Sequence, residues 1–271
     1  AIPRLKGSFR SRMSWRADPD SIRLNLALET DTLGGPRLRL RDVTGQLTVS
    51  TVRLPENIPA TTRLTINATA GYLERPFQTF RDNQLTIEYA DRRATVRLRS
   101  AQIGSESAFH TNMEVALLDD RNRITVRAFA LQMRNSTWGV PAPQVIDLYE
   151  DAVVFRKLAV QNKISGPGDS TDSLQRVTVD GVLSSQPSDT ARVQARNVHL
   201  GEFSRILALN NPIGGTLTAD VTLTQGRRIL ETTGNVSVGD LTYDGHPLGQ
   251  LRATSSYLPD RSTISLDATI A

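Results

Sequence analysis

Three histidines, His110, His199 and His246, are the side chains best suited to acid–base catalysis or metal binding at neutral pH. They lie far apart in the sequence, without the His-x-His or His-x-x-x-His spacing that places two imidazoles on one face. The chain has no cysteine, which excludes thiolate ligands, disulfides and cysteine nucleophiles. We therefore interpret the histidines as surface or turn residues.

Two pairs of adjacent carboxylates, Asp119–Asp120 and Glu150–Asp151, are the next candidates for chemistry. Neighbours in a strand point to opposite faces and neighbours in a turn face water, so neither pair predicts an acid–base dyad. The segments Asp18–Asp20 and Asp169–Asp172 offer too few oxygen ligands for a calcium loop. The nucleophile-elbow and P-loop motifs are also absent. We predict no enzymatic activity, no cofactor and no metal site.

Strands are the elements that would position any site in this chain. In the run Gly215–Thr224, apolar residues alternate with threonines and an aspartate, which is the period of two of a half-buried strand. The same alternation recurs along most of the chain, as at Ile22–Leu28, Leu64–Ala70 and Val236–Val238, with Gly, Pro, Asp and Asn clusters between the runs. The sequence therefore predicts an all-β, antiparallel meander.

Composition narrows the class of ligand. Aromatic residues make up 5% of the 271 residues, which counts against stacking on single-stranded nucleic acid. The formal charge is +4, and the arginines are scattered through the strands, which is typical of a solvated outer face; a weak attraction to anionic headgroups or nucleic acid is the alternative. We find no run of about 18 apolar residues that could span a membrane, and no signal peptide. We expect the chain to be a piece of a longer protein.

Helix candidates are few. Leu200–Leu209 predicts a short amphipathic helix, with Phe203, Ile206 and Leu207 on its apolar side, and Gln144–Glu150 is a weaker candidate. The segment Gly166–Ser173 predicts a loop. A loose repeat, Gly-x-Leu-Thr or a variant of it, opens strands at Gly45, Gly181 and Gly215 and suggests serial extension of the sheet.

From Trp138 to Ala271 the order of these elements resembles the translocation-and-assembly-module (TamB) branch of the AsmA-like proteins of diderm bacteria. The segments that carry the resemblance follow Trp138 in this order: Val153–Val160, Leu174–Ser184, Ala195–Gly201, Pro212–Leu223 and Gly234–Leu251.

The resemblance implies an elongated, mostly antiparallel curled sheet, a β-taco or open groove, with at most one or two short helices. It divides the chain into a β-rich repeat segment, 1–137, and a continuous TamB-like groove segment, 138–271. It further implies an internal segment of a periplasm-spanning protein, anchored in the inner membrane, that conducts phospholipids between the inner and outer membranes and supports outer-membrane biogenesis. The implied partners are phospholipid acyl chains and, for the full-length chain, a TamA-like outer-membrane β-barrel assembly protein, with no nucleic acid.

The alternation supplies the residues that we expect to line such a groove. An aliphatic lining suits acyl chains, because each buried methylene contributes about 0.8 kcal/mol. The sequence leaves three alternatives open: the apolar face is the core of a closed sandwich, a scaffold for outer-membrane protein assembly or secretion, or part of an adhesion or carbohydrate-binding sandwich. The predicted lining residues are Leu183, Val193, Leu217, Ala219, Val221, Leu223, Val236, Val238, Leu241, Ile264, Leu266 and Ile270.

Overall fold

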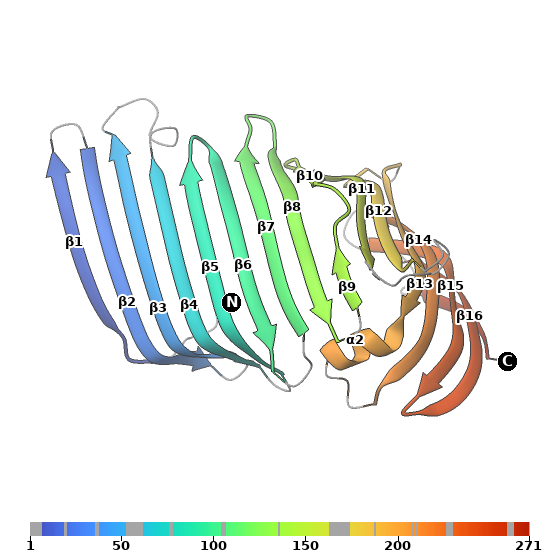
Figure 1. Ribbon diagram of the computed structural model, residues 1–271. Helices are drawn as coiled ribbons and strands as arrows, with labels where there is room; N and C mark the ends of the chain where they lie inside the picture. Colours follow the sequence, from blue (N-terminus) through green and yellow to red (C-terminus); the bar gives the residue numbers. More distant parts are fainter. Residues whose placement is uncertain are drawn as a thin grey trace. The chain divides into compact units, whose positions relative to one another are not determined.

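The computed structural model shows a chain built almost entirely of antiparallel strands (Figure 1). It describes residues 7–18, 21–35, 38–52, 62–75, 78–103, 107–134, 136–162, 174–186, 188–207, 209, 211–225, 230–258 and 263–270. The elements are β1 (Arg10–Asp18), β2 (Ser21–Gly35), β3 (Leu38–Val52), β4 (Arg63–Arg75), β5 (Gln78–Ala90), β6 (Arg93–Gln102), β7 (Ser107–Leu117), β8 (Asn122–Met133), β9 (Ser136–Gly139), β10 (Gln144–Leu148), β11 (Ala152–Asn162), β12 (Arg176–Ser184), β13 (Thr190–His199), α2 (Leu200–Ile206), β14 (Ile213–Gln225), β15 (Leu230–Tyr243), β16 (His246–Leu258) and β17 (Thr263–Ile270).

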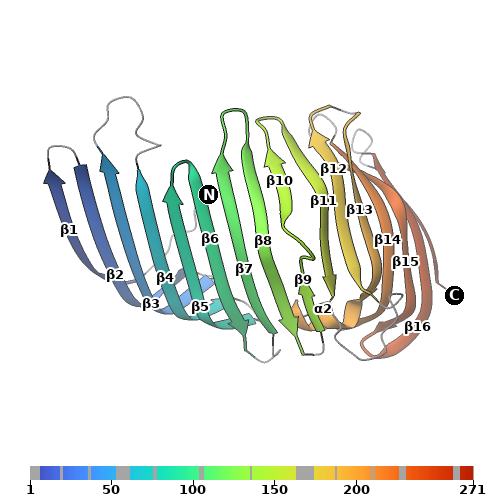
Figure 2. The same cartoon turned by 45° about the horizontal axis from the view of Figure 1, so that its top comes forward.

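Residue contacts divide the chain into two units. Unit 1 comprises residues 1–119 and 126–134, and unit 2 comprises residues 120–125 and 135–271, so that β8 contributes to both. In unit 1, β1 to β7 pair in sequence order and form one layer whose strands bend near one end (Figures 1 and 2). In unit 2, β10 to β17 pair in sequence order, and β11 to β16 follow one another around a strongly curved sheet. The prediction of an all-β, antiparallel curled sheet is confirmed within each unit.

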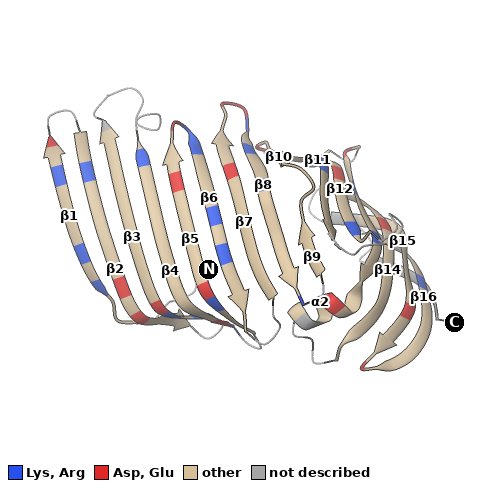
Figure 3. Cartoon of the chain, viewed as in Figure 1, with Lys and Arg blue, Asp and Glu red and all other residues tan. Residues whose placement is uncertain are grey.

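Strand formation follows the period-two pattern of the sequence. Along β2, Leu24, Leu26 and Leu28 are half-buried, whereas the intervening residues are exposed. In a strand with leucine at alternate positions, burying the face that carries the leucines stabilises the fold, and the other face can stay in water. Charged residues are accordingly distributed along the strands, as Figure 3 shows.

Bulges in the odd-numbered strands of unit 2 explain part of the curvature. Lys157, Asn197 and Asp240 have positive φ angles of 51°, 52° and 50°. The register shifts at each of them, in the β11–β12, β13–β14 and β15–β16 pairs. A bulge adds one residue to one strand of a pair, which bends that strand and increases its twist.

Helix α2, the one helix among the described residues, packs over the edge of β9 and the start of β14. The ring of Phe203 lies edge-on to that of Trp138, with centroids 5.3 Å apart, and Trp138 is 2% exposed. The hydroxyl of Ser204 donates to the carbonyl of Ile213 at 2.7 Å. The predicted helix extended to Leu209, but α2 ends at Ile206, and Leu207 is 61% exposed. The amide of Leu209 donates to the carbonyl of Ser204, which closes a wider turn and ends the helix before Leu207 can join its apolar side.

The second predicted helix is wrong. Gln144–Leu148 is strand β10, in which Val145 lies opposite Arg156 and Ile146 opposite Phe155 of β11. The two β-branched residues favour a strand, and pairing with β11 satisfies backbone groups that a single helical turn would leave open. The predicted loop at 166–173 lies outside the described residues. In the part of the chain that the structure describes, no helix has the length and hydropathy to cross a bilayer.

Candidate functional site

The candidate site is the apolar face of unit 2, whose side chains form rows across consecutive strands. Val193 of β13 lies opposite Val221 of β14, and Leu217 of β14 lies opposite Val238 of β15. Directly opposite residues of an antiparallel pair point to the same face. One complete row passes through β11 to β16 and consists of Val160, Val177, Ala195, Ala219, Val236 and Ala253.

A bulge returns Leu241 to this face. Leu241 lies opposite Gly249, whereas Val238 lies opposite Leu251, so three residues of β15 span two residues of β16. Because Gly249 and Leu251 share a face, Leu241 and Val238 share it too. The extra residue is accommodated around Asp240, whose φ is positive.

The burial of the apolar face varies along the strands. Val238, Ala191 and Ala195 are almost fully buried, at 5%, 0% and 7% exposed. The remaining predicted lining residues whose side chains are described are half-buried: Leu183, Val193, Leu217, Ala219, Val221, Leu223, Val236 and Leu241.

Three predicted lining residues lie on β17, the last strand. Its register places Ile264 opposite Tyr257, Leu266 opposite Ser255 and Ile270 opposite Leu251. The side chains of Ile264, Leu266 and Ile270 lie outside the part of the chain whose side chains the structure describes.

Unit 1 carries a similar apolar face that was not among the predicted site residues. Trp15 of β1 lies opposite Leu24 of β2 and is 70% exposed. The signal was present in the sequence, since the same alternation predicted these strands. A complete row passes through β1 to β7 and consists of Met13, Leu26, Leu47, Ile66, Ile87, Val96 and Met113.

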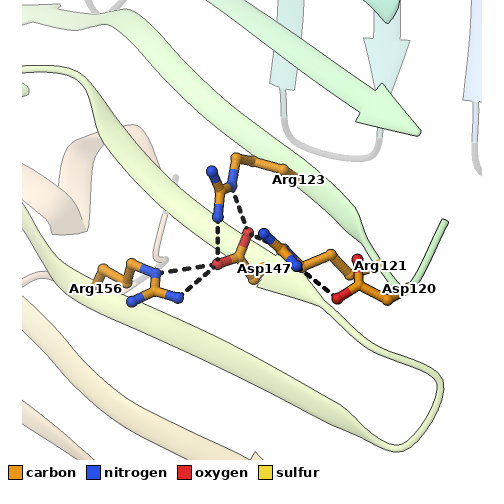
Figure 4. Close-up of polar contacts among 5 residues, drawn as sticks. All are labelled: Asp120, Arg121, Arg123, Asp147 and Arg156. Carbon is orange, nitrogen blue, oxygen red and sulfur yellow. Dashed lines mark hydrogen bonds and ion pairs between the residues drawn. The ribbon is translucent and has the colours of Figure 1, made fainter. Parts of the chain in front are cut away.

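On the opposite, polar face of unit 2, three arginines surround one carboxylate (Figure 4). Asp147 is 0% exposed and accepts from Arg123 at 2.7 and 3.1 Å and from Arg156 at 3.0 Å, and Arg121 lies 3.4 Å away. These hydrogen bonds, foremost those from Arg123, lower the pKa of Asp147 to about 2, against the opposing effect of burial. The cluster ties β8, β10 and β11 together and offers no free base for catalysis. Sequence reasoning missed it because the arginines are dispersed along the chain.

The structure gives Asp119, Asp120, His110 and His199 separate surroundings. Asp119 pairs with Arg92 at 2.6 Å, and Asp120 pairs with Arg121 at 2.6 Å. The imidazole of His199 lies 3.3 Å from the side-chain amide of Gln175, and His110 borders a hollow of unit 1. Among the described residues, no three His, Cys, Asp or Glu side chains are placed to hold a metal ion.

Hollows lined by described residues have borders of both polar and apolar residues. One of about 640 Å³ in unit 1 has Gln84, Arg99 and His110 in register across β5, β6 and β7. Another of about 380 Å³ lies on unit 2, and of the predicted lining residues only Ala219 and Val236 border it. Its polar border is formed by Thr218, Asp220, Asn235, Ser237, Arg252, Thr254 and Thr269.

Fold and site together define a class: an all-β protein of antiparallel sheets with one aliphatic face and one charged face. No protein-family model, no curated protein and no solved structure matches the chain.

Proposed function

We propose that the apolar face of this chain holds the acyl chains of phospholipids and conducts them along the sheet. The observation that carries the proposal is the set of aliphatic rows, in register across consecutive strands and left half-buried. In Figures 1 and 2 the described strands of unit 1 form a single layer, and in unit 2 side chains such as Val221 and Leu217 remain half-buried. A closed sandwich would bury the same rows almost completely.

The energetics suit movement as well as binding. Each methylene removed from water contributes about 0.8 kcal/mol, so an acyl chain of about 14 methylenes gains on the order of 10 kcal/mol before ordering costs. The row from Val160 to Ala253 contains only valine and alanine, so the gain is similar at each strand. Without polar anchors in the row, a chain meets no position at which it is held, and its headgroup stays in water.

The cellular role extends this proposal. Together with the resemblance to TamB-like proteins, the aliphatic face supports an internal segment of a periplasm-spanning protein that carries phospholipids between the inner and outer membranes. A TamA-like β-barrel assembly protein would be the outer-membrane partner of the full-length chain. This role concerns lipid movement and outer-membrane biogenesis, without catalysis.

Native mass spectrometry of the gently purified chain, with a lipid extract run in parallel, tests the proposal. We expect heterogeneous adducts at phospholipid masses that are lost in Val221→Asp, because a charge on the apolar face opposes acyl burial. The matched control is Thr218→Asp, on the same strand but on the polar face, where Thr218 is exposed and lies opposite Ser237. Val221→Thr, which keeps the shape of valine, should weaken uptake partially and guards against misfolding of the aspartate variant.

A clean apo mass with no uptake of added phospholipid would overturn the proposal and favour the scaffold alternative. Equal loss of adducts in Val221→Asp and Thr218→Asp would also contradict it, because lipid would then not depend on the apolar face. Circular dichroism of each variant establishes that the sheet is retained.

A further inference from the structure

A separate feature lies on the polar face of unit 2, where two arginines oppose each other. Arg176 of β12 lies directly opposite Arg196 of β13, and two positions along the strands Thr178 lies opposite Gln194. Alternate residues of a strand share a face, so all four side chains lie on the face opposite to the aliphatic rows. The same four residues line a hollow of about 210 Å³.

The charge of this pair is offset only in part, by the electrostatic interaction of Arg196 with Asp220. Like charges directly opposite each other destabilise a sheet. Asp220 of β14 is engaged by Arg192 and by the amide of Gln194, at 3.1 Å in the latter case. Within the described residues, no hydrogen bond or ion pair engages the guanidinium of Arg176 or that of Arg196.

Asp180 is the other acid on this stretch of β12. Its carboxylate accepts from the backbone amide of Lys157 at 2.9 Å, and the residue lies opposite Arg192. Along β12 to β14, Asp180, Arg192 and Asp220 thus alternate in charge from strand to strand. Arg176 and Arg196 lie next to this series, and no acidic residue lies between them. Such a pair is suited to an anion supplied from outside the chain.

We propose that the hollow between Arg176 and Arg196 is a binding site for a phosphate group. Guanidinium groups donate to phosphate oxygens in a planar, bidentate geometry, and two facing forks can hold one phosphate from both sides. The hydroxyl of Thr178, which also lines the hollow, supplies a further donor. A water occupies about 30 Å³, so the hollow has room for a phosphate group. The site is independent of the proposed acyl-binding face, because it lies on the other side of the sheet.

Phosphate can reach this site as the headgroup of a lipid or as a free ion, and two arms of one experiment distinguish them. The chain is titrated with inorganic phosphate by calorimetry in chloride buffer, and in parallel is floated with vesicles of phosphatidylcholine containing phosphatidic acid. Arg176→Gln and Arg196→Gln each remove one guanidinium group. Arg63→Gln makes the same charge change on an exposed arginine of β4 and serves as the matched control.

We expect one phosphate per chain, with affinity about tenfold or more weaker in Arg176→Gln and in Arg196→Gln and unchanged in Arg63→Gln. Added phosphate should raise the unfolding temperature of the unsubstituted chain but not of these two variants, because only a competent site is stabilised by its ligand. Arg176→Lys, which keeps the charge but loses the fork, should retain part of the binding. Vesicle binding that depends on both arginines, without binding of inorganic phosphate, assigns the site to a lipid headgroup.

Binding in both arms that is insensitive to Arg176→Gln and Arg196→Gln overturns the proposal, as does the absence of binding in both arms. The two variants are expected to fold at least as stably as the unsubstituted chain in phosphate-free buffer, because each relieves the repulsion. A loss of stability in that buffer would show that the pair already has a structural partner and would equally contradict a vacant phosphate site.

Discussion

Val221 of β14 lies directly opposite Val193 of β13, and the next residue along β14, Thr222, lies opposite Arg192. A step of one residue therefore passes from the aliphatic face to the charged face of the same sheet. Substitutions at neighbouring positions of β14 thus act on one face at a time, which makes the two faces separately testable.

The first prediction concerns how far the apolar face is covered. Val238 is 5% exposed, whereas Val221 is half-buried. Val238→Ala should lower the free energy of unfolding by about 2 kcal/mol, because it removes fully buried methyl groups and leaves a cavity. Val221→Ala should cost less than about 1 kcal/mol, because its methyl groups remain partly in water. Urea unfolding of delipidated protein measures both; equal costs would indicate that a second layer covers Val221.

The second prediction uses the two tryptophans as reporters. Trp15 is 70% exposed on the apolar face of unit 1, whereas Trp138 is 2% exposed beneath Phe203. Phospholipid brominated on its acyl chains should quench the emission of Trp15, because bound chains would lie against it, and should leave Trp138 unaffected.

Trp15→Phe provides the control for this measurement. Quenching should disappear in this variant, in which Trp138 is the only tryptophan. If it persists at the same level, the bound acyl chains approach Trp138 and the apolar face of unit 1 takes no part.

The alternation in the sequence was sufficient to predict the strands. It was also sufficient to predict that residues such as Leu217 and Val221 share one face. This succeeds because the period of two is a local property, and opposite pairing keeps it in register from strand to strand. It failed at Gln144–Leu148, a short segment whose conformation is decided by pairing with β11. It also failed to predict the cluster around Asp147, since Arg123 and Arg156 are brought to it only by the order of β8, β10 and β11.

The third prediction is a pH dependence that arises from Asp147. Its pKa is lowered to about 2 by its arginine partners, Arg123 above all, whereas the unfolded value is about 3.9. Because the folded-state pKa is the lower one, the stabilisation is complete above about pH 4 and is lost as the pH falls towards 2. The change amounts to about 3 kcal/mol. Asp147→Asn should destabilise the chain at pH 7 by about 3 kcal/mol, since it leaves the guanidinium groups without their acid.

The measurement compares unfolding free energies of the unsubstituted chain and Asp147→Asn between pH 7 and pH 2, where the two curves should converge. The pKa of Asp220 is also lowered to about 2, chiefly by hydrogen bonds from Arg192, but Asp220 is common to both proteins and cancels in the difference. Asp120→Asn, at a side chain 63% exposed, is the matched control and should change stability little. Parallel curves for the first pair would rule out Asp147 as the source.

The last prediction separates two glycines that look alike in the sequence. Gly181 has a φ of 119°, and a Cβ there would lie 2.2 Å from the carbonyl oxygen of Thr190. Gly45 has no positive φ, and its Cβ would meet only the Leu28 side chain, at 3.9 Å. Gly181→Ala should therefore cost more than about 2 kcal/mol, because both the backbone and its neighbour must move. Gly45→Ala should be neutral or stabilise by up to about 1 kcal/mol, because alanine loses less entropy in a strand. Thermal unfolding decides between them, and a tolerated Gly181→Ala would show that the backbone at Gly181, opposite Phe155, relaxes without cost.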